Sequence, residues 1–345
     1  MTTDADRRAA LAAAKLGALA RARFGDVGPE ARAGSFPDGA SLVEPAGGRA
    51  WILLGADAPH RLGAALALAD RAGVGALHLL VEGADAAADA AVLARRAQLF
   101  AAPPAVWLVV GTELEAVAPA PPGSDPAPPP EAELYRPVLD DAGLEVVVEG
   151  GHLIGELHGL EVARVVVDEG GSAHVEAGVG RFDREVGAMM FAELAETDAL
   201  ARAVEFVARH RRAGAPRHPL NQLVPDRWLR SVLVAEPARV GARELQPVGS
   251  AIARTSLRAR GVATAVGTDL DGRPLVVTCS TGVDLELVPS AADDRLAHAP
   301  DARLVLAVPE RDALPVTTEL ARHLRRPAEV VAVADDWAAA AEGLS

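Results

Sequence analysis

The chain has 345 residues, 50% of them hydrophobic, and a formal net charge of −14 at pH 7. This composition supports two or three domains with buried cores and excludes a disordered protein. The acidic balance argues against a protein that binds nucleic acid through sequence-independent phosphate contacts, because such binding needs a basic surface.

Two of the residues that occur only once exclude further classes of protein. The only cysteine, Cys279, rules out an intrachain disulfide and a cysteine zinc site, and its apolar neighbours predict a buried strand. The only lysine, Lys15, lies in an N-terminal helical segment, so a Walker phosphate loop and a Schiff-base enzyme are not expected. No charge-free window of about 18 apolar residues and no signal-peptide pattern occur. We therefore expect a cytoplasmic protein without a membrane span.

The first third of the chain predicts a helix and an α/β unit. Residues 1–30 predict an N-terminal helix whose narrow stripe of leucines and Phe24 packs on its own domain or, alternatively, forms an interaction surface. Residues 36–117 predict a first α/β repeat, a hairpin followed by helix, strand, helix and strand. Its strands are expected at 41–44, 51–54, 77–81 and 106–110.

The middle of the chain has a different pattern. Residues 118–130 are rich in proline and predict an extended linker. Residues 131–240 predict a β-rich hairpin region, then a helix at 197–212 and a short helical bridge. The strands of this region are expected at 144–148, 152–157, 160–167 and 173–179.

Residues 241–340 predict a second α/β repeat. Its strands are expected at 262–268, 275–279, 303–308 and 329–333. An offset of about 224 residues places Gly48 on Gly272 and Val106 on Val330, which indicates an internal duplication. The predicted fold class is therefore α/β, with duplicated β-hairpin plus βαβαβ units that flank a central β-rich hairpin region and helical bridge.

A glycine-turn hairpin followed by helix, strand, helix and strand resembles the core of the restriction-endonuclease-like, or PD-(D/E)xK, nuclease superfamily. The resemblance covers residues 38–112 and 262–335 and, more loosely, the central hairpin. It implies that a carboxylate and a lysine on the second hairpin strand, with a carboxylate from an earlier strand, hold a divalent metal. The matching strands, WILL at 51–54 and LVVT at 275–278, carry neither, so we expect both repeats to be inactive.

Only the central hairpin keeps suitable acids. Glu161 lies on one strand, in LEVARVVVD, and Glu176 lies on the next, in AHVEAGVGR. Under the resemblance these two residues would be the catalytic acids and the ligands of Mg²⁺. The lysine position corresponds to Gly178, and Arg181 is the residue that would supply positive charge in its place.

The predicted register of this hairpin separates the two acids. A two-residue turn at 170–171 would pair Val165 with Glu176 and place Glu161 on the same face. The two glutamates would then lie roughly 13 Å apart, too far to share one ion unless a bulge closes the gap. We therefore expect structural ion pairs instead.

Each of these acids has a candidate partner in the same hairpin. We expect Glu161 to pair with Arg181, and Glu176 to pair with Arg164 or to face solvent. Such pairs would hold the hairpin together without taking part in chemistry.

Histidines and two loop aspartates complete the candidates. His152 and His158 flank a strand that carries Glu156, and they are either surface or core histidines or part of a His/Glu metal site. Asp57 and Asp284 follow equivalent strands of the two repeats. They either cap helices or face a crevice at the carboxyl ends of the strands, where α/β proteins bind ligands.

The sequence leaves three functions open. The first is a degenerate, non-catalytic nuclease-fold protein of the cytoplasm that acts through contacts with a protein partner. The second is a metal-dependent nuclease, or a related phosphodiester hydrolase, that uses Glu161 and Glu176 with Mg²⁺. The third is a sensor of a small ligand or nucleotide that uses the crevices of the two repeats.

Overall fold

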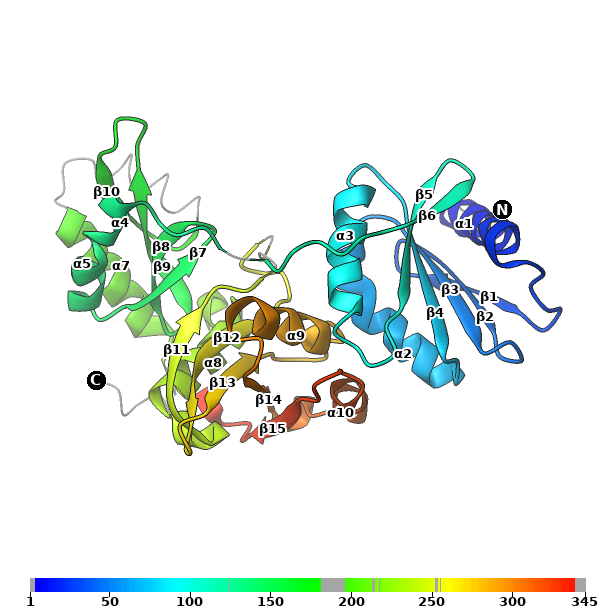
Figure 1. The fold of residues 1–345 in the computed structure, drawn as a ribbon. Helices are drawn as coiled ribbons and strands as arrows, with labels where there is room; N and C mark the ends of the chain where they lie inside the picture. Colours follow the sequence, from blue (N-terminus) through cyan, green and yellow to red (C-terminus); the bar gives the residue numbers. More distant parts are fainter. Residues whose placement is uncertain are drawn as a thin grey trace. The chain divides into compact units, whose positions relative to one another are not determined.

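The computed structural model describes residues 4–123, 125–180, 196–212, 215–216, 218–251, 254 and 256–338. The described residues form helices and three separate β-sheets, which confirms the α/β class (Figure 1). The chain divides into two compact units. One comprises Met1–Pro122 with Pro315–Pro327, and the other comprises Gly123–Leu314 with Ala328–Ser345.

The first unit is built on a six-stranded sheet of order β1-β2-β3-β4-β5-β6. The central strands β3, β4 and β5 are parallel, and every other neighbouring pair is antiparallel. Both faces of β3 are buried, as expected for a strand covered by helices on two sides. The strands are β1 (Arg32–Phe36), β2 (Gly39–Glu44), β3 (Arg49–Leu54), β4 (Ala76–Val81), β5 (Ala105–Val110) and β6 (Glu113–Ala116).

Helices cover this sheet on its two faces. The leucine stripe of α1 (Asp4–Phe24) packs on Trp51 and Leu53, so the helix is part of its own unit. The crossover helices α2 (Leu62–Ala72) and α3 (Ala86–Ala97) cover the other face (Figure 1). Gly73 ends α2 in the left-handed region, with its N–H bonded to the last turn, as is typical of a helix C-cap.

A late segment of the chain completes the first unit. Helix α10 (Pro315–Arg322) lies in this unit, although it follows a strand of the third sheet in sequence. Leu324, which follows α10 in the chain, forms an isolated antiparallel bridge with Phe100. The N–H of Ala101 donates to the carbonyl of His323 at 2.9 Å, which fixes the segment by main-chain bonds.

The second unit contains a four-stranded antiparallel sheet of order β10-β9-β8-β7. Leu139, Leu153, Val165 and Val207 belong to its buried core, together with side chains of three helices. These helices are α4 (Pro130–Glu133), α5 (Arg136–Asp141) and α7 (Glu196–His210). The strands are β7 (Glu145–Glu149), β8 (His152–Leu157), β9 (Leu160–Val167) and β10 (Ala173–Ala177).

The third sheet, of order β11-β12-β13-β14-β15, also belongs to the second unit. Helix α8 (Pro225–Ala235) packs Trp228 and Leu229 on one face, and α9 (Leu287–His298) covers the other (Figure 1). Cys279 is buried here as predicted, and burial raises the pKa of its thiol. The strands are β11 (Ala242–Val248), β12 (Ala263–Asp269), β13 (Pro274–Cys279), β14 (Arg303–Pro309) and β15 (Glu329–Val333).

The first and third sheets share one order of elements. In each, a helix precedes two antiparallel strands, and three strands linked by helices then run parallel. The strands expected in both repeats are present, and β1, β6 and β11 were not predicted. Common order is what a duplication would produce, and the duplication itself stays an inference.

Among the helices that the structure describes, none combines the length and the apolar character needed to cross a membrane.

Candidate functional site

The turn between β9 and β10 differs from the predicted one. The N–H of Gly171 donates to the carbonyl of Asp168 at 3.0 Å, and Gly171 adopts a φ of 80°. The N–H of Asp168 donates to the carbonyl of Ser172 at 3.0 Å, so the loop between these two residues has three residues, 169–171, with the left-handed glycine in the last position. Glu176 consequently lies opposite Arg164 and not opposite Val165, so the predicted register is wrong by one residue.

The structure places the two predicted acids around Arg164. Glu161 is buried, and both of its oxygens accept from Arg164, at 2.9 and 3.2 Å. Glu176 is the cross-strand neighbour of Arg164 and lies 3.9 Å from His174. Arg181 lies outside the described residues, so its predicted pairing with Glu161 is untested.

The described residues do not fit a divalent metal ion. Within them, no group of three or more histidine, cysteine, aspartate and glutamate side chains is arranged to hold one. Mg²⁺ needs carboxylate oxygens that are open to it, and the oxygens of Glu161 are engaged by a guanidinium. The described part of the central hairpin therefore lacks a donor set for the predicted Mg²⁺.

Asp57 and Asp284, the two loop aspartates, each contact a residue two or three positions further along the chain. Asp57 adopts a φ of 62° before a short 3₁₀-helix, its side chain makes no capping bond, and its carboxylate lies 2.5 Å from Nδ1 of His60. The predicted capping by Asp57 is therefore wrong. Asp284 accepts the N–H of Glu286 at 2.9 Å, directly before α9. This is an Asx turn that leads into the helix.

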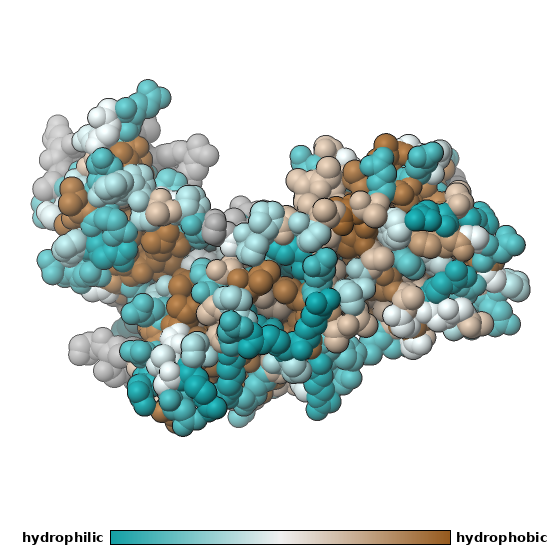
Figure 2. Space-filling view, in the orientation of Figure 1, coloured by the Kyte–Doolittle hydropathy of each residue, from teal (hydrophilic) through white to brown (hydrophobic). Residues whose placement is uncertain are grey.

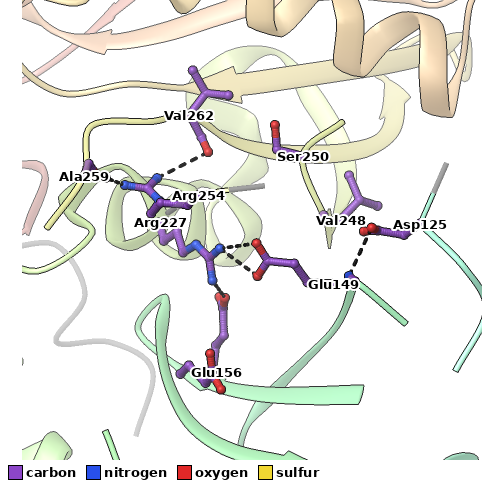
Figure 3. Close-up of polar contacts among 12 residues, drawn as sticks. Asp125, Glu149, Glu156, Arg227, Val248, Ser250, Arg254, Ala259 and Val262 are labelled. Atoms are coloured by element: carbon purple, nitrogen blue, oxygen red, sulfur yellow. Dashed lines mark hydrogen bonds and ion pairs between the residues drawn. The ribbon is translucent and has the colours of Figure 1, made fainter. Parts of the chain in front are cut away.

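A buried ionic cluster lies in the described part of the second unit, on a segment for which the sequence pattern predicted only a helical bridge. Arg227 and Arg230 lie three residues apart on α8, on the side away from its apolar face. Arg227 donates to Glu156 at 2.8 Å and to both oxygens of Glu149 at 2.7 Å (Figure 3). Arg230 also donates to Glu156. Glu156 is therefore a counter-ion of two arginines and is not a partner of His152 or His158.

Burial sets the charges of this cluster. Desolvation disfavours the Glu156 carboxylate, but Arg230 and Arg227 outweigh it and lower the pKa of Glu156. Glu145 lies directly opposite Glu156 on β7, and burial raises the pKa of its carboxyl. The hydroxyl of Ser231 donates to Glu145. The cluster thus has the properties of a buried structural network.

Another buried arginine, outside this cluster, supports the same helix. Arg211 has no exposed surface and donates to the carbonyls of His158, Leu220 and Leu223 at 2.7 to 2.8 Å. Its guanidinium carbon lies 4.8 Å from the centre of the Trp228 ring. Burial lowers the pKa of Arg211 to about 10. Arg211 therefore holds the segment before α8 by main-chain contacts.

A cavity of about 560 Å³ lies in the second unit, between the edge strands β7 and β11. This volume is in the range of small-molecule sites. The linker residue Asp125, the helix α5 and the last residues of α9 complete its walls. No sequence pattern pointed to this cavity, because the proline-rich residues 118–130 predict only a spacer. Its polar lining consists of Asp125, Arg136, Asp140, Gln246 and His298.

Comparisons of this chain with protein-family models, with curated proteins and with solved structures find no match.

Proposed function

We propose that this chain is a non-catalytic, nuclease-like protein of the cytoplasm that acts through contacts with a protein partner. The observation that carries the proposal is the engagement of two buried glutamates of the central sheet by arginines. Glu161 is held by Arg164, and Glu156 is held by Arg227 and Arg230. A guanidinium stays protonated at any physiological pH, so it neither releases these carboxylates to a metal nor shuttles a proton.

The strands of the two repeats support the same proposal. In β3, the strand that would carry a nuclease carboxylate, Trp51, Ile52 and Leu53 are all buried apolar residues. In β13 the corresponding positions include Val276 and Val277, which are also buried. The shared order of elements in the two sheets further favours a duplicated, degenerate unit. The burial of the only cysteine is compatible with a reducing compartment.

The surface indicates which kind of contact a partner would make. On the face shown in Figure 2, hydrophilic residues are interspersed with hydrophobic ones. The most exposed large hydrophobic residues of the described chain lie on different elements, for example Leu11 on α1 and Phe206 on α7. Together with the net charge of −14, this distribution favours polar contacts with a basic partner surface.

A nuclease assay tests the proposal. Purified protein is incubated with labelled single- and double-stranded DNA and RNA in Mg²⁺ or Mn²⁺, beside the variants Glu176→Ala and Glu161→Gln. We expect no cleavage above background for any of them. Glu169→Ala, in the exposed β9–β10 turn, is the matched control. Cleavage by the wild type that persists in Glu169→Ala but disappears in Glu176→Ala would replace this proposal with a metal-dependent hydrolase.

The cavity favours a second candidate function, a binding protein for a small ligand. Its volume of about 560 Å³ and its mixture of charged and apolar walls are typical of small-molecule sites. The cavity lies beside the central sheet, whereas the sequence pattern predicted a ligand at the crevices of the two repeats. A thermal-shift screen of small metabolites against the whole chain tests this candidate, since a ligand of the folded state raises the unfolding temperature.

A further inference from the structure

Gly249, in the wall of the cavity between β7 and β11, lies close to atoms of two other wall residues. A Cβ at Gly249 would lie 2.3 Å from Oδ2 of Asp125 and 2.8 Å from the carbonyl of Val148, so no other residue fits there without displacement. Oδ1 of Asp125 accepts the N–H of Gly150 at 3.0 Å (Figure 3). The Asp125 carboxylate thus lies beside Gly150, which follows β7, and beside Gly249, which follows β11.

His298 is fixed by the same glycine. Its Nε2 lies 2.7 Å from the carbonyl of Gly249, and since a carbonyl only accepts, Nε2 carries the proton. In the neutral ring, Nδ1 is then left as an acceptor. The imidazole of His298, at the end of α9, is therefore oriented by a main-chain carbonyl.

The charge of the lining is negative on balance. Arg136 uses Nε and Nη2 to bind Glu133, at 2.8 and 3.0 Å. The hydrogen bonds to Glu133 raise the pKa of Arg136, and Asp140 adds to this effect, so Asp140 lies within electrostatic range of the same guanidinium. The lining itself thus carries two carboxylates, Asp125 and Asp140, and one arginine, Arg136, and its apolar walls include Val146 and Val148.

We propose that this cavity binds a small aliphatic amine in its cationic form. The carboxylates of Asp125 and Asp140 receive the ammonium groups, and the valines of β7 contact the methylene chain. The inference rests on the second candidate function, ligand binding, and does not depend on the nuclease assay.

Calorimetric titration of the whole chain with putrescine (1,4-diaminobutane) at low salt tests the inference. We expect saturable binding that Asp140→Asn and Asp125→Asn each weaken about tenfold, because each removes one charge from the lining. Asp140 and Asp125 are both exposed, and the asparagine retains a carbonyl oxygen for Gly150, so both variants should fold. Asp141→Asn, on the same helix but outside the lining, is the matched control and should bind as the wild type does.

Two further ligands and a peptide make the test specific. Butane-1,4-diol has the same chain without charge, and succinate has the opposite charge, so neither should bind measurably. Equal binding of either, equal loss in Asp141→Asn, or no heat of binding up to about 1 mM putrescine would overturn the inference. A blocked lysine peptide that binds more tightly than putrescine would also overturn it, and would assign the cavity to a lysine side chain of a partner protein.

Discussion

Asp294 is a buried carboxyl group within the third sheet and its covering helix. It accepts the N–H of Ala251 at 2.7 Å and the hydroxyl of Ser250 at 2.9 Å, and the hydroxyl of Thr264 also donates to it. Burial raises the pKa of Asp294, although these donors and His298 oppose the shift. The folded protein therefore holds a proton on this carboxyl more tightly than the unfolded chain does.

The raised pKa of Asp294 makes its contribution to the stability of the fold depend on pH. A carboxyl whose pKa is raised by folding contributes stability at low pH, and the contribution is lost as the pH rises from about 4 through the raised pKa. Asp294→Asn should keep the hydrogen bond from Ala251 and remove a buried charge. Between pH 4 and pH 8, we expect the free energy of unfolding of the variant to rise by about 1 kcal/mol or more relative to that of the wild type.

Urea unfolding followed by tryptophan fluorescence measures this difference, because Trp228 and Trp337 belong to the same core. The free energies of unfolding of wild type and Asp294→Asn are compared at both pH values. A difference that stays constant with pH would show that Asp294 has the same pKa in the folded and unfolded states.

At the scale of elements, the turn between β8 and β9 touches the backbone of α8. His158 and Gly159 both adopt positive φ, 49° and 70°, which is the two-residue turn that matches the twist of a hairpin. A Cβ at Gly159 would lie 2.2 Å from the carbonyl carbon of Arg227 and 2.6 Å from the nitrogen of Trp228. Helix α8 can lie this close to the hairpin only because Gly159 has no side chain.

A pair of glycine variants separates close approach from backbone strain. Gly159 and Gly171 both have positive φ in turns of the central sheet, but a Cβ at Gly171 meets nothing within 4 Å. Gly171→Ala should therefore cost only the left-handed strain, about 1 kcal/mol. Gly159→Ala must also displace α8, and we expect it to cost about 3 kcal/mol or more. Chemical denaturation of both variants measures the difference, and equal costs would refute the close contact.

The sequence predicted elements better than their pairing. Alternation and helical spacing located β8, β9 and β15 with their observed bounds, because buried strands and amphipathic helices repeat with different periods. The edge strand β11 was missed, since Ala242 and Leu245 are buried in a run of exposed residues that has no clear alternation. The register of β9 and β10 was missed because it depends on the left-handed Gly171 in the turn.

The partners within the ionic cluster were beyond the reach of sequence patterns. Arg227 and Glu156 lie 71 residues apart, and no local spacing relates them. Arg164 lies opposite Glu176 across the two strands, but its guanidinium donates to Glu161, a pairing that was not predicted. The cavity was missed for the same reason as the cluster, because its walls come from elements far apart in the chain.

At the scale of the whole molecule, α8 joins the two sheets of the second unit, one by apolar packing and the other by ion pairs. Trp228, Leu229 and Val232 pack on the third sheet, while Arg227 and Arg230 bind the carboxylates of the central sheet. One side of the helix is held by the hydrophobic effect, and the other is held by charges that exclude water. The central sheet is therefore attached by interactions that depend on every partner being present.

Glu156→Gln tests this attachment. The variant leaves two buried guanidinium groups without their shared counter-ion, which should cost about 3 to 5 kcal/mol. Hydrogen exchange should rise in β7 to β10 and in α8, and stay unchanged in β1 to β6, which belong to the first unit. Glu205→Gln, which breaks the exposed pair with Arg209, is the control and should cost less than about 1 kcal/mol. Unchanged exchange in the central sheet would show that the cluster does not hold it.

The late segment Pro315–Pro327 has a consequence for how the protein is made. Because α10 and Leu324 complete the first unit, a ribosome must synthesise almost the whole chain before that unit receives its last helix. An N-terminal fragment that ends at Pro122 lacks this helix and leaves Phe100 without its main-chain partner. The strands of the first unit leave the ribosome first, yet the unit is completed only at Pro327, shortly before Ala328–Ser345 completes the second unit.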